Sequence, residues 1–153
     1  HGEDYVPEIG TAMKLRDGVD VALIATGLMV GRCLEAAEIL AVEKIEARVI
    51  EVHTLKPLDV ATLVDAAGET GAIVTAEEHN VIGGLGSAVA EVTSSECPVP
   101  VKRVGINDRF AESGPYNEML EKHGLSVQEV VSAAHSALQA KRDYVREKPA
   151  YEN

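Results

Sequence analysis

Carboxylates, a histidine and glycines gather in one short stretch of the chain, from Glu77 to Gly86. In a β-strand, Glu77 and His79 would point to the same side, because side chains alternate along a strand. A carboxylate beside an imidazole could start a metal site, but two ligands are too few for zinc unless another residue, such as His53, joins them. We therefore predict no metal site and expect His79 to be a hydrogen-bonded side chain at a domain or subunit contact.

The glycines Gly83, Gly84 and Gly86 could hold an anion, because exposed backbone N–H groups at the start of a helix bind phosphate. Their spacing is neither that of a dinucleotide fingerprint nor that of a phosphate loop with its lysine. The preceding Glu77 and Glu78 would repel a phosphate. Two interpretations remain open: tight packing of a helix against a strand, or an anion site.

Two other segments carry polar residues after apolar runs. His53 and Lys56 follow one such run, and Lys56 could contact a substrate or cofactor phosphate. Alternatively, Lys56 is solvated and Asp59 caps the next helix. After the last apolar run, a polar loop contains the only phenylalanine of the chain, Phe110, which should be buried against another surface.

The overall charge limits the class of protein. The chain has 25 acidic and 14 basic residues and a net charge of −11, which argues against nucleic-acid or anionic-membrane binding. No segment approaches the roughly 18–20 apolar residues of a membrane span. Cys33 and Cys97 form no disulfide framework. These observations favour a single domain in the reducing cytoplasm.

The elements that must position these residues are alternating strands and helices. Uniformly apolar or β-branched runs predict strands at 21–25, 47–52, 72–76 and 101–106. Helical patterns cover 28–42, 58–67, a segment after Gly84, a short segment after Pro115 and a last one opened by Ser126. A further strand within 11–15 precedes Asp17-Gly18, which predicts a hairpin to the strand at 21–25.

Three strand–helix–strand passages after a hairpin predict a three-layer α/β/α fold. Its five-stranded sheet should be mostly parallel, with the first strand antiparallel at the edge. The domain should span residues 11–142, after an irregular linker at 1–10 that enters from an upstream part and before a C-terminal tail at 143–153.

Four segments together resemble a known family. They are VALIATG at 21–27, RVIEVHTLKPLD at 48–59, EEHNVIGGLGSAVAE at 77–91 and VPVKRVGINDRFAESG at 99–114. The chain resembles the C-terminal domain of transketolase-type, thiamine-diphosphate-dependent enzymes from about Glu8 to Leu125. It is most similar to the C-terminal section of transketolases, which in split transketolases is a separate subunit.

The resemblance implies a strand order in which the second strand lies between the third and the fourth. Thr26 and Gly27 would then face Glu77 to Asn80 at a switch point of the sheet. It also implies that the loop with Phe110 lies near a neighbouring pyrimidine-binding domain, so that Phe110 is buried in an interface.

The implied activity is transfer of two-carbon ketol units between sugar phosphates, as in the pentose phosphate pathway, with thiamine diphosphate and magnesium. Other domains of the family carry the GDG…NN motif and the activating glutamate, and neither motif is present here. We expect no catalytic residue and no cofactor in this chain, and we expect the chain to be inactive on its own. Its expected partners are the pyrimidine-binding and diphosphate-binding domains or an N-terminal subunit of the same enzyme, in a homo-oligomer. Alternatives are a small-anion-binding or regulatory module, or the same domain of a deoxyxylulose-phosphate synthase or 2-oxoacid dehydrogenase β subunit.

Overall fold

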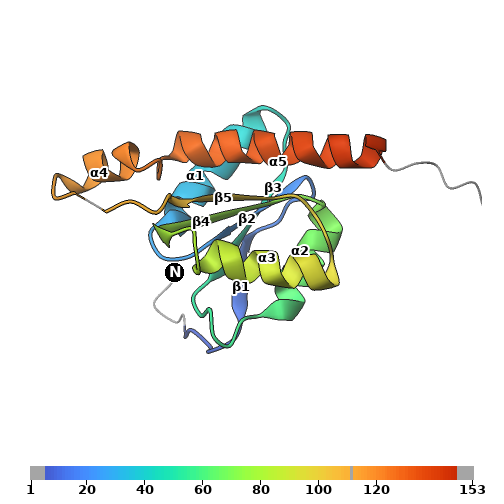
Figure 1. Ribbon diagram of the computed structural model, residues 1–153. Coiled ribbons are helices and arrows are strands. Elements are labelled where there is room, and N and C mark those ends of the chain that lie inside the picture. The colour runs from blue at the N-terminus through green and yellow to red at the C-terminus, as the bar shows by residue number, and fades with distance from the viewer. Residues whose placement is uncertain (1–5, 111, 148–153) are drawn as a thin grey trace, which may run out of the picture.

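A five-stranded sheet forms the middle of the molecule, with helices on both faces (Figure 1). The computed structural model describes residues 6–110 and 112–147. The strands are β1 (Ala12–Arg16), β2 (Val21–Ala25), β3 (Ala47–Val52), β4 (Ile73–Asn80) and β5 (Val101–Ile106). The helices are α1 (Met29–Val42), α2 (Val60–Thr70), α3 (Leu85–Glu96), α4 (Tyr116–Lys122) and α5 (Val127–Glu147). The predicted α/β fold class is confirmed.

The strands are ordered β1-β3-β2-β4-β5, so β2 lies between β3 and β4 as the resemblance implied. Only β1 runs antiparallel, and it lies at the edge of the sheet. Helices α1 and α5 cover one face, and α2 and α3 cover the other (Figure 1). The crossovers from β2 and from β3 therefore lie on opposite faces, as in doubly wound sheets.

The predicted hairpin between the first two strands is wrong, because β1 pairs with β3. The loop after β1 crosses over the start of β3, where a Cβ atom on Gly18 would overlap the backbone of Ala47 and Arg48. Asp17 in this loop pairs with the buried Arg48, its Oδ1 atom lying 3.0 Å from Nη2. The chain thus crosses the start of β3 before it enters β2. Asp17-Gly18 lies in this crossing loop and not in a tight hairpin turn.

The core is aliphatic and lies on both sides of β2, in which every residue is fully buried. Val21, Leu23 and Ala25 pack with residues of α1 and α5. Ala22 and Ile24 pack with residues of α2 and α3. This two-sided burial explains why β2 is uniformly apolar, since a central parallel strand has no solvent face.

Helix ends follow local capping chemistry. Asp59 accepts a hydrogen bond from the Thr62 N–H, and Gly71 ends α2 in the left-handed region with φ of 64°. The Ser126 hydroxyl accepts from the Glu129 N–H at the start of α5, which confirms the predicted cap. Helix α2 lies about two residues later in the chain than predicted, and α5 continues to Glu147, past residue 142.

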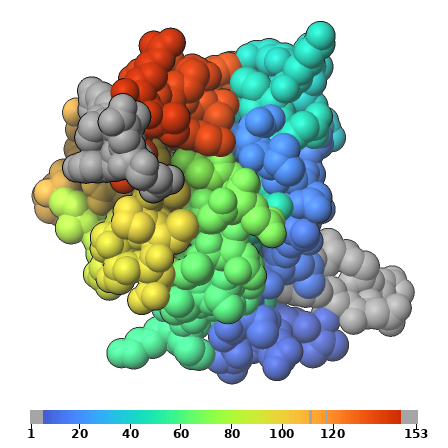
Figure 2. Space-filling view, turned by 90° about the vertical axis from the view of Figure 1, so that its right-hand side faces the viewer, coloured from blue at the N-terminus to red at the C-terminus, as the bar shows by residue number. Residues whose placement is uncertain are grey.

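The two ends of the sheet differ in what they present. The carboxyl ends of the parallel strands lie at the end of the molecule where α4 projects (Figure 1). Figure 2 shows the opposite end, with the last turns of α3 in yellow and of α5 in red. None of the helices in the described part of the chain has both the length and the apolar character that crossing a membrane requires.

Candidate functional site

The carboxyl ends of β2 and β4 meet at the switch point of the sheet. The Thr26 N–H donates a hydrogen bond to the Ala76 carbonyl at 3.2 Å. Gly27, with φ of 59°, then turns the chain into α1, while β4 continues to Asn80. Residues 77–80, which were predicted to follow the fourth strand, are therefore the last residues of β4 and lie next to Thr26 and Gly27.

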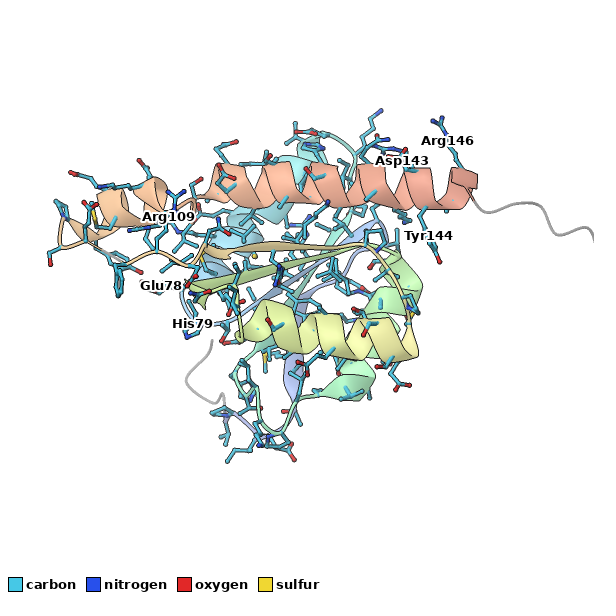
Figure 3. The ribbon with its side chains drawn as sticks, in the orientation of Figure 1. Glu78, His79, Arg109, Asp143, Tyr144 and Arg146 are labelled. Atoms are coloured by element: carbon cyan, nitrogen blue, oxygen red, sulfur yellow. The ribbon has the colours of Figure 1, made fainter. Side chains whose placement is uncertain are left out.

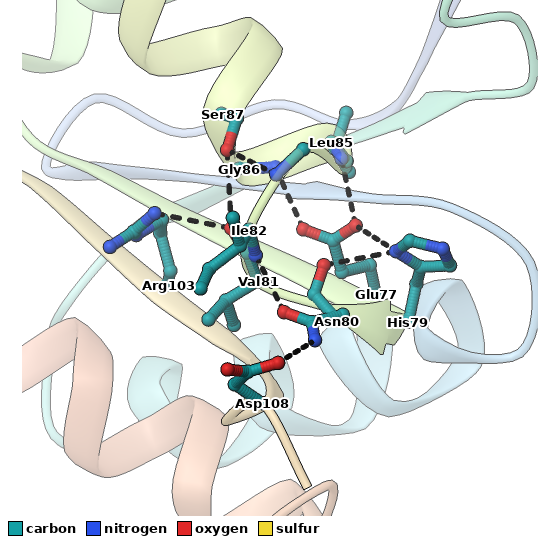
Figure 4. A network of polar contacts seen from close by, with 11 residues as sticks. Glu77, His79, Asn80, Val81, Ile82, Leu85, Gly86, Ser87, Arg103 and Asp108 are labelled. Atoms are coloured by element: carbon teal, nitrogen blue, oxygen red, sulfur yellow. Dashed lines mark hydrogen bonds and ion pairs between the residues drawn. The ribbon is translucent and has the colours of Figure 1, made fainter. Parts of the chain in front are cut away.

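Glu77 is the organising residue of this corner, and it is 2% exposed. Its Oε2 atom accepts a hydrogen bond from the Leu85 N–H at 2.7 Å, and its Oε1 atom accepts one from the Gly86 N–H at 2.8 Å (Figure 4). The Nδ1 atom of His79 lies 3.9 Å from Glu77 Oε2, on the same side of the strand. The carboxylate thus caps the start of α3, where the helix dipole also favours negative charge.

The glycine turn is shaped to fit this carboxylate. Gly83 has φ of 79°, and its N–H donates to the Ser87 hydroxyl at 2.9 Å. A Cβ atom on Gly84 would lie 2.8 Å from Glu77 Cδ. Because the amides of Leu85 and Gly86 are already bonded to Glu77, they are not free to hold a phosphate or the diphosphate of thiamine diphosphate. The geometry favours the packing interpretation of the glycines.

A second set of contacts joins the end of β4 to the loop after β5. Asn80 Nδ2 donates to Asp108 Oδ1 at 3.1 Å, and Asn80 Oδ1 accepts from the Ile82 N–H at 2.8 Å (Figure 4). The Arg103 guanidinium donates to the Val81 carbonyl at 3.1 Å. No local sequence pattern predicts the Asn80–Asp108 pair, because the pair depends on a register irregularity between β4 and β5.

Glu78 and His79 are the exposed polar residues of β4. The Tyr116 hydroxyl donates to Glu78 Oε2 at 3.1 Å and so connects α4 with the end of the sheet. Partial desolvation, followed by this hydrogen bond and the charge of Glu78, raises the pKa of Tyr116. His79 is largely exposed, and its Nδ1 atom lies 2.9 Å from the Asn80 carbonyl oxygen. Figure 3 shows Glu78 and His79 at this end of the molecule.

Large exposed apolar side chains follow three of the strands at this end of the sheet. Leu28 after β2 is 58% exposed, Ile82 after β4 is 65% exposed and Phe110 after β5 is fully exposed. Phe110 is therefore not buried by the described part of this chain, and its burial in an interface stays a prediction. An aromatic side chain in this position buries its surface only if another surface covers it.

His53 and Lys56 lie at the end of β3, on the other side of β2 from β4. His53 Nε2 lies 2.8 Å from the Glu8 carbonyl oxygen, so His53 holds the segment before β1. Lys56 is exposed and has no bonded partner among the described residues. No three His, Cys, Asp or Glu side chains lie together in a metal-binding group in residues 6–110 and 112–147.

Comparisons with known proteins agree with this fold. Residues 10–130 match the family described as "Transketolase, C-terminal domain". Over 133 residues, 87% of this chain, the sequence is 50% identical to the 6-deoxy-6-sulfo-D-fructose transketolase subunit of a Clostridium species, of which the match spans 41%. It is also 44% identical over 135 residues to 1-deoxy-D-xylulose-5-phosphate synthase 1 of Geobacter sulfurreducens, covering 87% of this chain and 21% of that protein.

A solved structure is similar over nearly the whole fold. It is a split-gene transketolase in an inactive beta4 tetramer, with a TM-score of 0.89 and 51% sequence identity, and the match covers 93% of this chain and 46% of that one. The chain thus spans less than half the length of each of these relatives. On the match over residues 10–130 and these identities, the chain belongs to the transketolase C-terminal domain family.

Proposed function

We propose that this chain is the assembly domain of a cytoplasmic transketolase, and that it docks other parts of the enzyme through its exposed carboxyl edge. The single observation that carries the proposal is that the amides at the start of α3 are occupied by a side chain of the protein itself, while large apolar side chains at the same end of the sheet are exposed. Glu77 occupies the amides at which α3 could have bound an anion. At the same end of the sheet, exposed apolar side chains follow β2, β4 and β5: Leu28, Ile82 and Phe110. Such an edge suits a protein partner better than a small ligand.

The partner in this proposal is the pyrimidine-binding part of the enzyme, in the same polypeptide or in a separate subunit. Phe110 is the anchor, because exposed aromatic side chains dominate binding when they enter a pocket. Glu78, His79 and Asn80 at the end of β4 would supply the polar contacts of this edge, and Asn80 is joined to the loop of Phe110 through Asp108. The tetrameric split-gene transketolase supports an assembly with more than one copy of the chain.

The chemistry proposed for the assembly is transfer of a two-carbon ketol unit between sugars. Thiamine diphosphate would supply the carbanion stabilisation, and the other parts of the enzyme would hold it with magnesium. The residues of this chain contribute by positioning their neighbour. The donor sugar is not assigned, because one relative is named for a sulfo-sugar and another for deoxyxylulose phosphate.

The test is an assay of the chain alone and with the remaining part of the enzyme supplied as a second polypeptide. Alone, the chain should neither bind thiamine diphosphate in a calorimetric titration nor transfer ketol units. Phe110→Ser should weaken association with the second polypeptide about tenfold or more, since it removes a large apolar anchor. Its melting temperature should not fall, because Phe110 makes no buried contact in the chain.

The matched control is Tyr144→Ser, a substitution of a half-exposed aromatic residue on α5 at the opposite end of the fold (Figure 3). It should leave association unchanged. Binding of thiamine diphosphate by the chain alone would overturn the proposal. Formation of 1-deoxyxylulose 5-phosphate instead of ketol transfer by the assembly would replace the proposed reaction but keep the docking role.

A further inference from the structure

A groove of about 510 Å³ lies along the edge strand β5, whose other neighbour is β4. Its walls are β5 with the loop that follows it, the end of α4 and the first turns of α5. Its volume is within the range of small-molecule sites, about 300–1,000 Å³. Neither the family match nor the proposed docking edge assigns a function to this groove.

The groove gathers positive charge in an acidic protein. Four Lys or Arg residues line it, from a total of 14 in a chain with net charge −11. They are Lys102, Arg103, Arg109 and Lys122, and the one carboxylate in the lining is Glu129. Because like charges repel, such a cluster is stabilised when an anion binds among them.

Two of these cations are available to a ligand. Lys102 is half-buried and Arg109 is exposed, and neither has a hydrogen-bonded or ionic partner among the residues that the structure describes. Lys122 pairs with Glu112 at 2.5 Å, and Arg103 donates to the Val81 carbonyl. Lys102 and Arg109 come from β5 and from the loop after it, so an anion between them would tie this loop to the sheet.

Other polar groups complete the lining. His123, which ends α4, has a solvent-inaccessible Nε2 atom without a hydrogen-bond partner in the described structure. Ser132 and Ser136 lie one turn apart on α5, and Asn107 lies opposite them on the β5 side of the groove. Hydroxyl, amide and carboxylate groups next to cations are the donor and acceptor set that a phosphorylated sugar requires.

We propose that this groove binds a phosphorylated sugar, with its phosphate between Lys102 and Arg109 and its hydroxyl groups toward Glu129 and the serines. The groove shares the loop after β5 with the docking edge, since Arg109 precedes Phe110, but the inference is argued from the lining of the groove and does not depend on the proposed function. Glu129 has a defined role in it: it accepts from sugar hydroxyl groups, and it disfavours a bare anion.

The experiment titrates the protein with ribose 5-phosphate, and separately with inorganic phosphate and with ribose, by calorimetry and by amide NMR. Ribose 5-phosphate should bind saturably and shift the signals of β5 and of the first turns of α5. Inorganic phosphate should bind more weakly, and ribose should not bind detectably. Lys102→Gln and Arg109→Gln should each weaken binding of ribose 5-phosphate about tenfold, as expected for loss of a charge-assisted contact.

Two further variants make the test specific. Glu129→Gln should reduce the preference for ribose 5-phosphate over inorganic phosphate. Arg146→Gln removes the same charge at the far end of α5 and should leave binding unchanged (Figure 3). All four variants should melt as the parent protein does, because the changed side chains are exposed or half-buried.

Three results would overturn the proposal. One is the absence of saturable binding of ribose 5-phosphate. Another is equal weakening by Arg146→Gln and by Lys102→Gln, which would mean that only the net charge matters. The third is a shift of the same NMR signals when the protein is concentrated without ligand, which would identify the groove as a contact between copies of the chain.

Discussion

Gly84 has no room for a side chain because the carboxyl group of Glu77 fills the space beside it. A Cβ atom on Gly84 would lie 2.8 Å from Glu77 Cδ and 2.9 Å from the Asn80 carbonyl oxygen. The φ of Gly84 is −96°, a value that any residue adopts, so its requirement is for space and not for backbone freedom. The glycine turn and the buried carboxylate are therefore one structural unit, and both should be sensitive to substitution.

Replacing Glu77 should destabilise the fold. Glu77→Ala removes the acceptor of two buried amide hydrogen bonds, and bonds to a charged group contribute about 1.5–3 kcal/mol each, so we expect a loss of about 3 kcal/mol. Urea unfolding followed by circular dichroism measures the change. Glu91→Ala, an exposed position on α3, is the control and should change stability by less than about 0.5 kcal/mol.

Gly84→Ala should cost about 1–3 kcal/mol, as overpacking does in a well-filled interior. The cost should shrink when Glu77→Ala is already present, because one of the two clashing groups is then gone. A double-mutant cycle by urea unfolding measures this coupling. Additive effects of the two substitutions would show that the crowding does not limit the turn.

A glycine elsewhere in the fold provides the opposite result for comparison. Gly68 lies inside α2, is exposed, and would meet no atom within 4 Å of an added Cβ. Gly68→Ala should therefore stabilise the protein by about 0.5–1 kcal/mol through helix propensity. A loss of stability at Gly68 would mean that glycine substitutions harm this chain for reasons unrelated to local space.

Stability should fall in acid partly through Asp59. Burial opposes ionisation of Asp59, but hydrogen bonds from the Ala12 N–H and from Thr62 outweigh burial and lower its pKa in the folded state. A lowered folded pKa stabilises the protein above the unfolded pKa, about 3.9, and the stabilisation disappears as the pH falls through the folded pKa. Urea unfolding between pH 6 and pH 3 measures this loss.

Asp59→Asn should flatten that acid dependence while retaining a helix cap. The control is Asp65→Asn, at an exposed position of the same helix, which should leave the slope as in the parent protein. An equal slope in the parent protein and the Asp59→Asn variant would contradict the assignment.

The thiol of Cys33 should be unreactive in the folded protein. Burial raises the pKa of its thiol to about 12, so the reactive thiolate is scarce at neutral pH. Iodoacetamide at pH 7.5 should modify the partly exposed Cys97 first, and Cys33 only after urea is added. Mass spectrometry of digested protein measures both rates. Equal rates in the native state would show that the helix carrying Cys33 opens readily.

The sequence predicted those elements whose residues share one environment. β2, β3 and β5 were predicted with their observed bounds because the β-branched residues Val and Ile recur through each run. β4 continues to Asn80, four residues past its predicted end. Its polar residues remain in the strand because α3 and the loop after β5 supply their partners. Those partners are far along the chain, so a local pattern does not reveal them.

The candidate site was also predicted only in part. Alternation along a strand correctly placed Glu77 and His79 on one side. It did not reveal that Glu77 caps α3, because this depends on how the glycine turn returns the helix to the strand. The basic groove also escaped prediction, since its cations come from β5, the following loop and α4, which the fold alone brings together.

The pairing of β1 with β3 gives the first strand a protective task. β3 is almost wholly buried and is rich in Val and Ile, and without β1 its backbone N–H and C=O groups would form an open edge. Open apolar edges recruit strands from other molecules and lead to aggregation. β1 covers that edge with a short strand whose register breaks between Lys14 and Arg16, so the new outer edge is irregular and charged. A shortened form that begins after Arg16 should therefore be far less soluble than its composition suggests.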